Sequence, residues 1–347
     1  MQEGQDTTLL APRLHGQRLE KDFEKIRDMY GIPFTFCLKY LWSMPLLYGH
    51  DFCFRAALLA KMKSVDLVYA RYLGAAAWSS VFGIPTMYEA HVPPQDNTAL
   101  FYFRKLICGT GFQKLVVISS ALKKIFMERF KIQEEKICVA HDGVDLERFE
   151  KMPNVLEARQ KLGLSAQSFT VGYAGHLYPG RGMERLEFLA KTFPAFQFLA
   201  MGGTDLDLQR FKNRLKENNI SNLRCFGFVP NARLPLYLAA CDVLLMPYQK
   251  KVGLKSGGDT SAWMSPMKMF ESMAAGKLIL SSDLPVLREV LNEKNAVLID
   301  PENEDAWGQA LEHAAQNPFW RQELARQAKK DVLPYSWRRR VQKVLGN

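Results

Sequence analysis

The chain has 347 residues, of which 48% are hydrophobic and 24% charged, and its formal net charge is +10. This length exceeds what one hydrophobic core usually holds, so it predicts two domains, and the ordinary composition excludes a disordered or fibrous protein. The sequence contains no run of about 20 apolar residues and no visible secretory signal, and its six cysteines are scattered. It therefore predicts a cytoplasmic protein without a membrane-spanning helix.

Short apolar runs alternate with helical patterns along the first 150 residues. This alternation predicts parallel strands covered by helices. Strands are expected at residues 7–11, 34–38, 66–70, 85–89, 114–118 and 136–140. The clearest helix is expected at 120–130, where Ser119 or Ser120 can cap the first turn and the apolar residues fall on one stripe.

The second half repeats this alternation after an expected connector at residues 151–167. Strands are predicted at residues 170–174, 196–201, 223–227, 243–247, 278–281 and 296–299, with helices between them. This is the pattern of a doubly wound sheet, whose ligand lies at the carboxyl ends of the strands. A long loop at 249–262, with Gly253, Gly257 and Gly258, lacks apolar periodicity and has the length of a functional loop.

The segment SPMKMFESMAAG at 265–276 carries the most chemical information. Ser265 as a cap, Pro266 in the first turn and Gly276 as a stop predict a short helix. Its amino end offers N–H groups to a diphosphate, and Lys268 adds a cation there. Glu271 lies nearly one turn further on and can accept hydrogen bonds from ribose hydroxyls. From these residues alone, an ordinary amphipathic helix with a Lys–Glu pair remains the alternative.

A series of motifs follows in a fixed order: DGVDLERF at 142–149, GYAGHLYPGRG at 172–182, FGFV at 226–229, ACDVLLMPY at 240–248, SPMKMFESMAAGK at 265–277 and SDLPVLRE at 282–289. From about residue 66 to the end, the chain resembles the retaining glycosyltransferases of family 4, particularly members with a Ser-Pro-Leu-Lys-type helix. The resemblance implies an α/β protein of GT-B architecture, with two Rossmann-like domains facing a cleft in which catalysis occurs. The acceptor-side domain is expected at 1–155, with the helix at 333–347 packing back on it, and the nucleotide-sugar domain at 165–332.

The same resemblance implies roles for individual residues of the second domain. Arg181 and Lys268 resemble the basic pair that holds the diphosphate, and their charge would stabilise the leaving group in place of a metal. Glu271 resembles the ribose-binding carboxylate, and Gly175 resembles the glycine turn that lets the backbone approach phosphate. The implied donor-binding set is completed by Phe228 and Val229 near the nucleobase and by Ser265, Pro266 and Met267 at the helix start.

In the first domain, the sequence YEAH at 88–91 resembles the family's Glu-x-His turn. His91 is therefore the third candidate for catalysis, through contact with the donor sugar, and a structural histidine is the alternative. Arg71 is a weaker candidate for the same cleft. Glu89 is not assigned as a nucleophile, because retention needs no fixed base when the leaving phosphate takes the acceptor proton.

The chain departs from the family pattern at several positions. The first of the family's paired glutamates falls at Trp263, so the identity of the donor sugar is not carried over. In the glycine turn, His176 stands where arginine is common, and Arg181 replaces the lysine that follows. The start GQDTTLLAP resembles the family's second strand, so we expect the first βα unit to be missing and two strands to be left unpaired.

Three further segments suggest partners. Residues 34–62, rich in aromatic residues and leucine, suggest a membrane-surface contact, against the alternative of a core strand and helix. Asp205 and Asp207 resemble a metal-binding pair, but acidic residues in a first helical turn explain them, so we expect no metal and no other cofactor. The basic tail at Arg338–Arg340 resembles the family's closing helix, so we expect no nucleic-acid partner.

The sequence thus predicts a metal-independent glycosyltransferase of the hexosyltransferase type, located in the cytoplasm or peripherally on the inner face of the membrane. Its donor is expected to be a UDP-, GDP- or ADP-sugar, and its acceptor a glycan or lipid-linked molecule of cell-surface polysaccharide or glycolipid biosynthesis. Two alternatives stay open: a silent or truncated GT-B subunit that binds a partner transferase, and a sugar-nucleotide epimerase. Donor base, sugar, acceptor, linkage and oligomeric state are not determined by the sequence.

Overall fold

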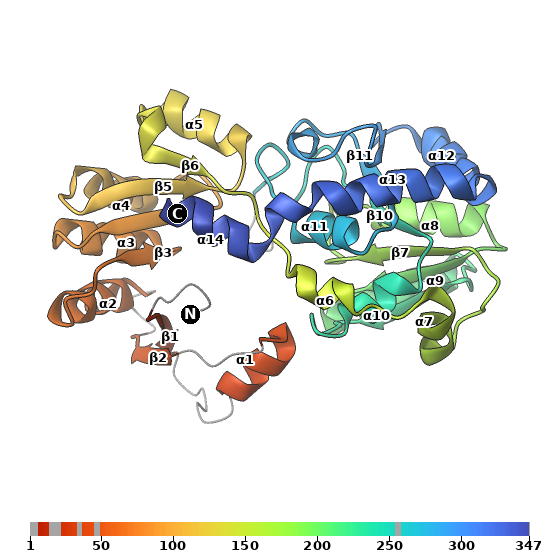
Figure 1. The fold of residues 1–347 in the computed structure, drawn as a ribbon, viewed down its shortest axis with the longest axis horizontal. Helices are drawn as coiled ribbons and strands as arrows, with labels where there is room; N and C mark the ends of the chain where they lie inside the picture. The colour runs from red at the N-terminus through yellow and green to blue at the C-terminus, as the bar shows by residue number, and fades with distance from the viewer. Residues whose placement is uncertain (1–5, 14–21, 33–36, 45–48, 254–257, 347) are drawn as a thin grey trace. The chain divides into compact units, whose positions relative to one another are not determined.

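The computed structural model describes residues 6–13, 22–32, 37–44, 49–253 and 258–346. The chain divides into two compact units, Met1–Ala140 and His141–Asn347, and each is built around parallel strands (Figure 1). The predicted α/β class with two Rossmann-like sheets is therefore confirmed. This division lies before the predicted limit at residue 155 and assigns the motif at 142–149 to the second unit. The packing of residues 333–347 on the first domain stays a prediction.

The first unit contains two separate parallel sheets, one of order β1-β2 and one of order β3-β4-β5-β6. Its elements are β1 (Thr8–Arg13), α1 (Asp22–Tyr30), β2 (Cys37–Trp42), α2 (His50–Met62), β3 (Val68–Ala70), α3 (Leu73–Val81), β4 (Thr86–Ala90), α4 (Asn97–Cys108), β5 (Phe112–Val117), α5 (Ser120–Phe130), η2 (Glu134–Lys136) and β6 (Ile137–Val139).

The two N-terminal strands pair with each other and, among the described residues, β1 and β3 each pair on one side only, as expected for two strands that lack a central strand between them. They run parallel from the Thr8–Cys37 pair to the Arg13–Trp42 pair. Mutual pairing satisfies backbone N–H and C=O groups that would otherwise lack partners. The second of these strands is described from Cys37, and residues 34–36, with which the predicted strand begins, lie outside the described ranges.

Helix α5 forms where its sequence pattern predicts. Ser119 Oγ accepts a hydrogen bond from Leu122 N at 3.1 Å, so Ser119 is the capping residue. Leu122 and Phe126 are fully buried, as their places on the apolar stripe require.

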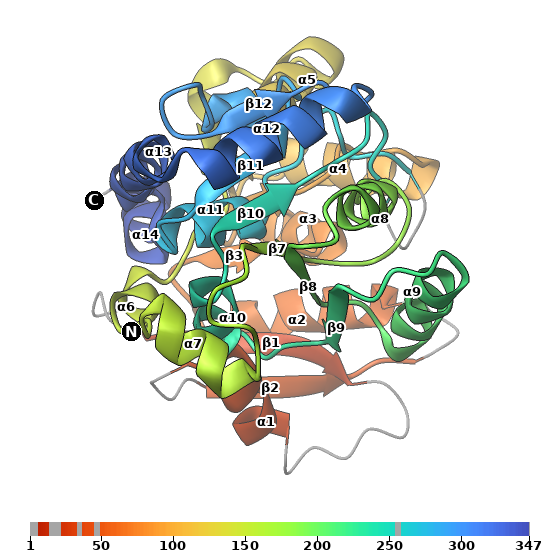
Figure 2. The ribbon, with the colours of Figure 1, turned by 90° about the vertical axis from the view of Figure 1, so that its right-hand side faces the viewer.

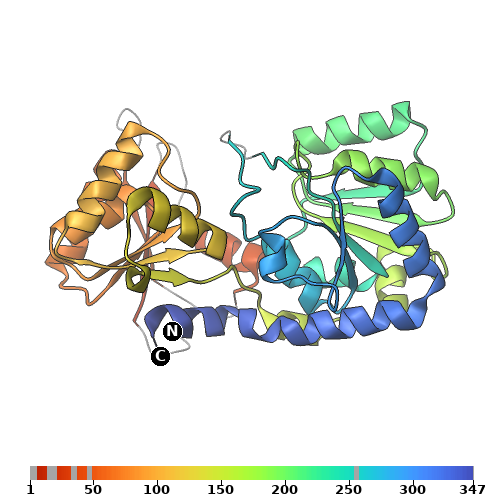
Figure 3. The same ribbon diagram turned by 90° about the horizontal axis from the view of Figure 1, so that it is seen from above.

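The second unit is one six-stranded parallel sheet of order β12-β11-β10-β7-β8-β9, with helices on both faces (Figures 2 and 3). Its elements are α6 (Leu146–Glu150), α7 (Val155–Leu162), β7 (Thr170–Ala174), α8 (Met183–Thr192), β8 (Gln197–Met201), α9 (Asp205–Glu217), β9 (Leu223–Gly227), α10 (Leu234–Ala239), β10 (Val243–Met246), α11 (Met267–Ala274), β11 (Leu278–Ser282), η3 (Leu287–Glu289), β12 (Val297–Ile299), α12 (Glu304–Gln316), α13 (Pro318–Asp331), η4 (Leu333–Tyr335) and α14 (Trp337–Leu345).

The order of this sheet places its direction change between β7 and β10. From β7 the chain proceeds to β8 and β9, and it then returns to the other side of β7 as β10, β11 and β12. In a doubly wound sheet, such a switch point leaves a crevice at the carboxyl ends of the two central strands. The loops that follow β7 and β10 therefore begin at the same edge.

Three local expectations need correction or refinement. The expected connector at 151–167 contains helix α7, whose cap Asn154 accepts a hydrogen bond from Glu157 N. The helix expected between β11 and β12 is reduced to the single 3₁₀ turn η3. Asp207 closes a capping box with Thr204 at the start of α9, which gives it the structural role that its first-turn position indicated.

The predicted long loop is tied together near its two ends. Gly253 and Asp259 form an isolated antiparallel bridge. The Asp259 carboxylate accepts hydrogen bonds from Val252 N and Ser261 N, each at 2.9 Å. Gly257 lies outside the described residues.

The loops after β7 and β10 touch through glycine. Gly182 has a φ of 84°, and a Cβ placed on it would stand 1.8 Å from the Pro247 carbonyl oxygen. Only a residue without a side chain fits both this conformation and this approach.

We therefore expect Gly182→Ala to lower the free energy of unfolding by more than about 2 kcal/mol, since backbone must move and a positive φ becomes strained. Gly308→Ala in helix α12 is the matched control, because nothing lies within 4 Å of the added Cβ. This control should leave stability unchanged or raise it by up to about 1 kcal/mol. Urea unfolding measures both, and equal effects of the two substitutions would contradict the assigned contact.

Candidate functional site

The predicted donor residues of the second unit gather at the switch point of its sheet. Gly175 and Arg181 lie in the segment that follows β7, and Lys268 and Glu271 lie in α11, after β10. The two segments come from adjacent strands, and both begin at the carboxyl edge.

Lys268 has an unusual environment. Its Nζ is buried and lies 4.3 Å from the ring centroid of Tyr173 and 4.3 Å from that of Tyr248. Among the described residues, this nitrogen has no hydrogen-bond partner. Two aromatic faces attract a cation but leave its three donors unused.

Arg181 adds a second positive charge beside the ring of Tyr248, which also contacts Lys268. Its guanidinium carbon lies 5.6 Å from the Tyr248 ring centroid and 5.3 Å from that of Tyr178. Its Nε–H group is buried and has no hydrogen-bond acceptor in the described part of the chain. Burial lowers the pKa of Lys268 well below its ordinary value, and the Arg181 charge lowers it further. An anion placed here would relieve both effects.

Glu271 is the carboxylate of the site. Burial raises its pKa to about 7, while the positive charges of Arg148 and Lys268 act in the opposite direction. Arg148 belongs to α6 and pairs with Asp145 at 3.3 Å. Near neutral pH, this carboxyl group is divided between its two protonation states.

Gly175 brings the backbone close to the lysine. With a φ of 153°, it has no room for a side chain, because a Cβ would stand 2.9 Å from the Tyr173 hydroxyl oxygen and 3.4 Å from Lys268 Nζ. The Tyr173 hydroxyl donates a hydrogen bond to the His176 carbonyl at 2.6 Å. The His176 ring stacks on Tyr178 at 4.7 Å, so the histidine that departs from the family pattern is held within the turn.

The start of α11 differs from its prediction. The N-cap residue is Pro266, with Met267 as the first helical residue, and no side chain caps the helix. Ser265 is therefore not the cap, because its Oγ accepts a hydrogen bond from Asp142 N at 2.9 Å instead. The backbone of Pro266 is extended, with a ψ of 121°, so the helix starts one residue later than the serine signal suggested. Gly276, with a φ of 61°, follows the helix end as predicted.

Phe228 and Val229 lie apart from this cluster in the sheet order. They follow β9, the edge strand, whereas the lysine and glutamate follow β10. The Phe228 side chain is 61% exposed, which leaves it available to a ligand, and its contact with a nucleobase stays a prediction. An open cavity of about 500 Å³ is lined by the loop after β10 and by residues after β11 and β12, and none of the predicted donor residues lines it.

The first unit holds its own polar cluster at the end of β4. The buried Glu89 carboxylate accepts a short hydrogen bond from the Tyr69 hydroxyl and contacts His91 Nε2 at 2.6 Å. Arg71 Nε lies 3.8 Å from the same carboxylate. Glu89 thus fixes the orientation of the His91 ring, a positioning role that the sequence analysis did not assign.

The aromatic rings around Lys268 were not predicted. Tyr173 and Tyr248 belong to strand motifs of the sequence, and in the structure they supply both faces around Lys268. Arg148 was likewise quoted in a motif without a role. One signal was available in the sequence: each tyrosine lies within or just after a buried strand that borders the predicted site. A buried tyrosine hydroxyl usually has a hydrogen-bond partner, so these residues could have been assigned to the site.

We expect Lys268→Met to stabilise the ligand-free protein by on the order of 1–2 kcal/mol at neutral pH, because a buried, unpaired charge is removed while the volume is kept. The sign with pH follows from the lowered pKa: the folded state binds fewer protons, so wild-type stability rises relative to the variant as pH approaches the ordinary lysine value of 10.5. Urea unfolding at several pH values measures this difference. A variant less stable than wild type throughout would contradict the unpaired state of Lys268.

Solved structures with a similar fold cover nearly the whole chain. A structure of Alr3699/HepE from Anabaena in complex with UDP has a TM-score of 0.72 at 17% identity, covering 98% of each chain. A glycosyltransferase from Rickettsia africae has a TM-score of 0.70 at 17% identity, covering 98% of this chain and 96% of its own. These likenesses show the GT-B fold.

Several relatives with similar sequences match this chain over only part of their own length. A D-inositol 3-phosphate glycosyltransferase from Stackebrandtia nassauensis is 24% identical over 81% of this chain and 67% of its own length. An alpha-galactosylglucosyldiacylglycerol synthase from Streptococcus pneumoniae is 25% identical over 46% of this chain and 41% of its own. A putative teichuronic acid biosynthesis glycosyltransferase from Bacillus subtilis is 22% identical over 60% of this chain and 52% of its own. The matches thus span between two fifths and two thirds of these relatives.

Both halves of the chain also match defined protein families. Residues 1–148 match the family described as Glycosyltransferase Family 4, and residues 168–317 match the one described as Glycosyl transferases group 1. These matches cover the cluster around Glu89 in the first unit and the lysine–arginine site in the second. The chain belongs to the group 1 glycosyltransferases of family 4.

Proposed function

We propose that this protein transfers a sugar from a nucleoside diphosphate sugar to a glycan or lipid-linked acceptor, with retention of the anomeric configuration and without a metal. The observation that carries the proposal is the buried Lys268 Nζ, which has no hydrogen-bond partner among the described residues and stands next to the positive charge of Arg181. A diphosphate supplies the negative charge and the acceptor oxygens that these two groups lack.

Glu271 supports a nucleotide rather than a bare phosphate as the ligand. A carboxylate repels a phosphate, yet it accepts hydrogen bonds from the two hydroxyls of a ribose. It follows Lys268 by three positions on α11, so both side chains lie on the same side of the helix. One turn of helix therefore offers a cation for the diphosphate and an acceptor for the adjoining sugar.

The chemistry of transfer follows from these charges. The bond between the anomeric carbon and the diphosphate oxygen breaks, and the negative charge that develops on that oxygen is stabilised by Lys268 and Arg181. The acceptor hydroxyl forms the new bond on the same face of the sugar, and its proton passes to the departing diphosphate oxygen. No protein nucleophile is required for this sequence of steps.

The printed names of similar proteins narrow the substrates that we propose. HepE has been crystallised with UDP-glucose, so we infer a UDP-sugar as the first donor to test. The pneumococcal relative is named for synthesis of a diacylglycerol glycolipid and the Bacillus relative for teichuronic acid biosynthesis. These names support an acceptor of the lipid-linked or polysaccharide class.

A catalytically silent subunit is the second candidate, favoured by Trp263. This residue stands where the family resemblance places a glutamate that contacts the donor sugar. A silent subunit would retain the diphosphate site yet transfer nothing. An epimerase would release an altered sugar nucleotide in the absence of any acceptor.

We expect one class of nucleotide sugar, among UDP-, GDP- and ADP-sugars, to raise the melting temperature of the protein. The shift should be lost in Lys268→Ala and in Glu271→Ala, because each removes a group that binds the diphosphate or the ribose. Thermal unfolding with each nucleotide sugar, with and without EDTA, measures this effect. EDTA should leave the shift unchanged.

Lys216→Ala and Glu217→Ala are the matched controls, since both side chains are exposed at the end of α9. Both should retain the shift. A wild-type protein that no nucleotide sugar stabilises would contradict the donor site. Stabilisation without sugar transfer to extracted lipid or polysaccharide acceptors would identify the silent subunit instead.

We expect His91→Gln to lower the turnover number about 100-fold, as is typical for loss of one polar contact to the reacting sugar. The nucleotide-induced thermal shift should persist, because the residues proposed to hold the nucleotide belong to the second unit. Steady-state kinetics and thermal unfolding separate the two effects. An unchanged turnover number would show that the Glu89–His91 pair is only structural.

A further inference from the structure

Helix α2 carries an apolar stripe on its outer side. Phe54, Leu58 and Met62 follow one another at intervals of four residues and are therefore aligned along the helix. Their side chains are 41%, 41% and 75% exposed, while Phe52, Cys53 and Ala56 on other sides of the helix are buried in the core of the unit. Helix α2 thus contributes to the core of the unit, as the alternative interpretation expected, and it also presents an uncovered apolar stripe.

The stripe continues across the two neighbouring helices. The Phe54 ring packs edge-on against two aromatic rings. Its centroid lies 5.2 Å from that of Trp78 in α3 and 5.7 Å from that of Phe82, just beyond α3. Lys105 of α4 lies over Trp78 at 5.4 Å and over Phe101 at 5.1 Å, and the Phe101 side chain is 53% exposed. We call the outward side chains of α2, α3 and α4 the helical face.

The charges of the helical face have one sign. Helices α2, α3 and α4 contain four basic residues, Arg55, Lys61, Arg104 and Lys105, and one acidic residue, Asp51. The side chain of Asp51 is only 9% exposed, and its carboxylate accepts hydrogen bonds from the Ser43 hydroxyl and Met44 N. The exposed charge beside the apolar stripe is therefore positive.

Several basic side chains are arranged along apolar surface. Lys61 Nζ donates to the backbone carbonyl of Phe82 at 2.9 Å, so its side chain reaches from α2 to the C-terminal end of α3. Lys105 runs between Trp78 and Phe101 in the same way. Long basic side chains that cover apolar surface and end in a charge are suited to the boundary between hydrocarbon and polar head groups.

We propose that the helical face binds the surface of a bilayer that contains anionic lipids. The apolar stripe would enter the boundary between head groups and acyl chains, and the basic residues would meet lipid phosphates. A protein partner is disfavoured, because the cores of protein interfaces are depleted in lysine. This surface goes beyond the proposed transfer reaction and does not depend on it.

The attachment that we propose is shallow and reversible. Among the described residues, no helix combines the length and the apolar character needed to cross a bilayer. The stripe follows one side of a 13-residue helix whose other sides are buried in the protein. Binding to the bilayer should therefore depend on both apolar insertion and charge. For a contact of this size, neither contribution alone is enough for stable attachment.

The test is flotation of the full-length protein with vesicles of phosphatidylcholine alone and of phosphatidylcholine mixed with phosphatidylglycerol. We expect binding to the anionic vesicles that weakens as salt is raised, because salt screens the attraction between basic residues and lipid phosphates. Binding to the neutral vesicles should be at least about tenfold weaker.

Two double variants separate apolar insertion from charge. Leu58→Ser with Met62→Ser should weaken binding to anionic vesicles by about tenfold or more, since two exposed apolar side chains are removed. Lys63, the residue that follows Met62 at the end of α2, is a further exposed basic residue beside the stripe. Lys63→Glu with Arg104→Glu should weaken binding by more than about tenfold, since each basic residue near the surface contributes to attraction. All four side chains are exposed, so the variants should keep the wild-type unfolding curve.

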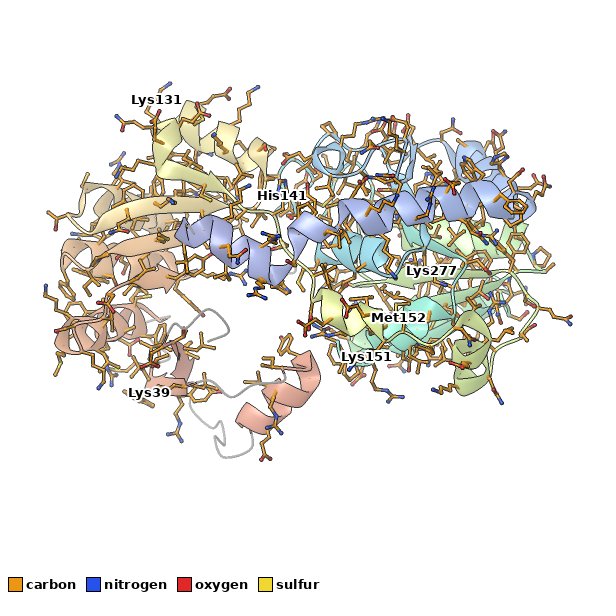
Figure 4. All side chains as sticks on the ribbon, viewed as in Figure 1. Lys39, Lys131, His141, Lys151, Met152 and Lys277 are labelled. Carbon is orange, nitrogen blue, oxygen red and sulfur yellow. The ribbon has the colours of Figure 1, made fainter. Side chains whose placement is uncertain are left out.

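Matched controls exclude general effects of polarity and net charge. Leu156→Ser with Leu206→Ser removes two exposed leucines of the second unit, which are 63% and 55% exposed. Lys131→Glu with Lys151→Glu reverses the same amount of charge after α5 and after α6 (Figure 4). Both controls should bind vesicles as the wild type does.

Three outcomes would overturn the proposal. One is equal binding to neutral and anionic vesicles, and another is equal loss of binding in the stripe variant and its control. The third is a wild-type protein that binds no vesicles but forms a dimer in solution that the stripe variant lacks. Because vesicle binding needs no nucleotide, each of these results leaves the proposed transfer reaction untouched.

Discussion

The pairing of β7 with β10 in the centre of the second sheet is the constraint on which the candidate site depends. Val243 lies opposite Val171, and Leu244 opposite Gly172. Before this pair, Asp242 N donates to the Thr170 carbonyl, and the Asp242 carboxylate accepts from Thr170 N and from Arg159. These bonds set the register of two strands that are far apart in sequence. Without that register, the ends of β7 and β10, which lead to the segments with Arg181 and Lys268, would not lie next to each other.

The site that results is electrostatically unbalanced. Two positive groups lie beside the Tyr248 ring, and the carboxyl group that acts on Lys268, that of Glu271, has a raised pKa and is partly neutral near pH 7. A folded protein gains nothing from such an arrangement by itself, because burial of an unpaired charge opposes folding. The imbalance is compatible with a ligand that carries the missing negative charge. Residues that are unfavourable in the empty protein are thus the ones expected to interact most strongly with a diphosphate.

Much of the second unit could be predicted from the sequence, and the reasons are local. The buried strand β7 appears as a nearly continuous apolar run, so its bounds agree with the prediction, and the bounds of the edge strand β9 agree as well. Of the residues that the structure brings together, Gly175 and Arg181 follow β7, and Lys268 and Glu271 lie in α11, after β10 and its long loop. The tyrosines around Lys268 were missed because strand periodicity indicates burial but not which ring lies over which cation.

Predictions that depended on contacts distant in sequence were less successful. Serine is a typical helix-capping residue, yet the Ser265 hydroxyl accepts a hydrogen bond from Asp142 N, over a hundred positions earlier in the chain. The mutual pairing of β1 and β2 and the reduction of a helix to η3 were likewise not visible in local patterns. The exposed side of α2 could not be separated from its buried side by composition, because both contain phenylalanine.

The peptide segment that joins the two units has very little rotational freedom. On one side, Ala140 N donates to the Val117 carbonyl of the first unit. On the other side, the His141 ring pairs with Glu289 at 2.8 Å, and its carbonyl accepts a hydrogen bond from Arg340. Backbone torsions between these anchored groups are limited to those around a single peptide link. The boundary between the units is therefore not a flexible linker, because the two adjacent residues Ala140 and His141 are each held by hydrogen bonds within their own unit.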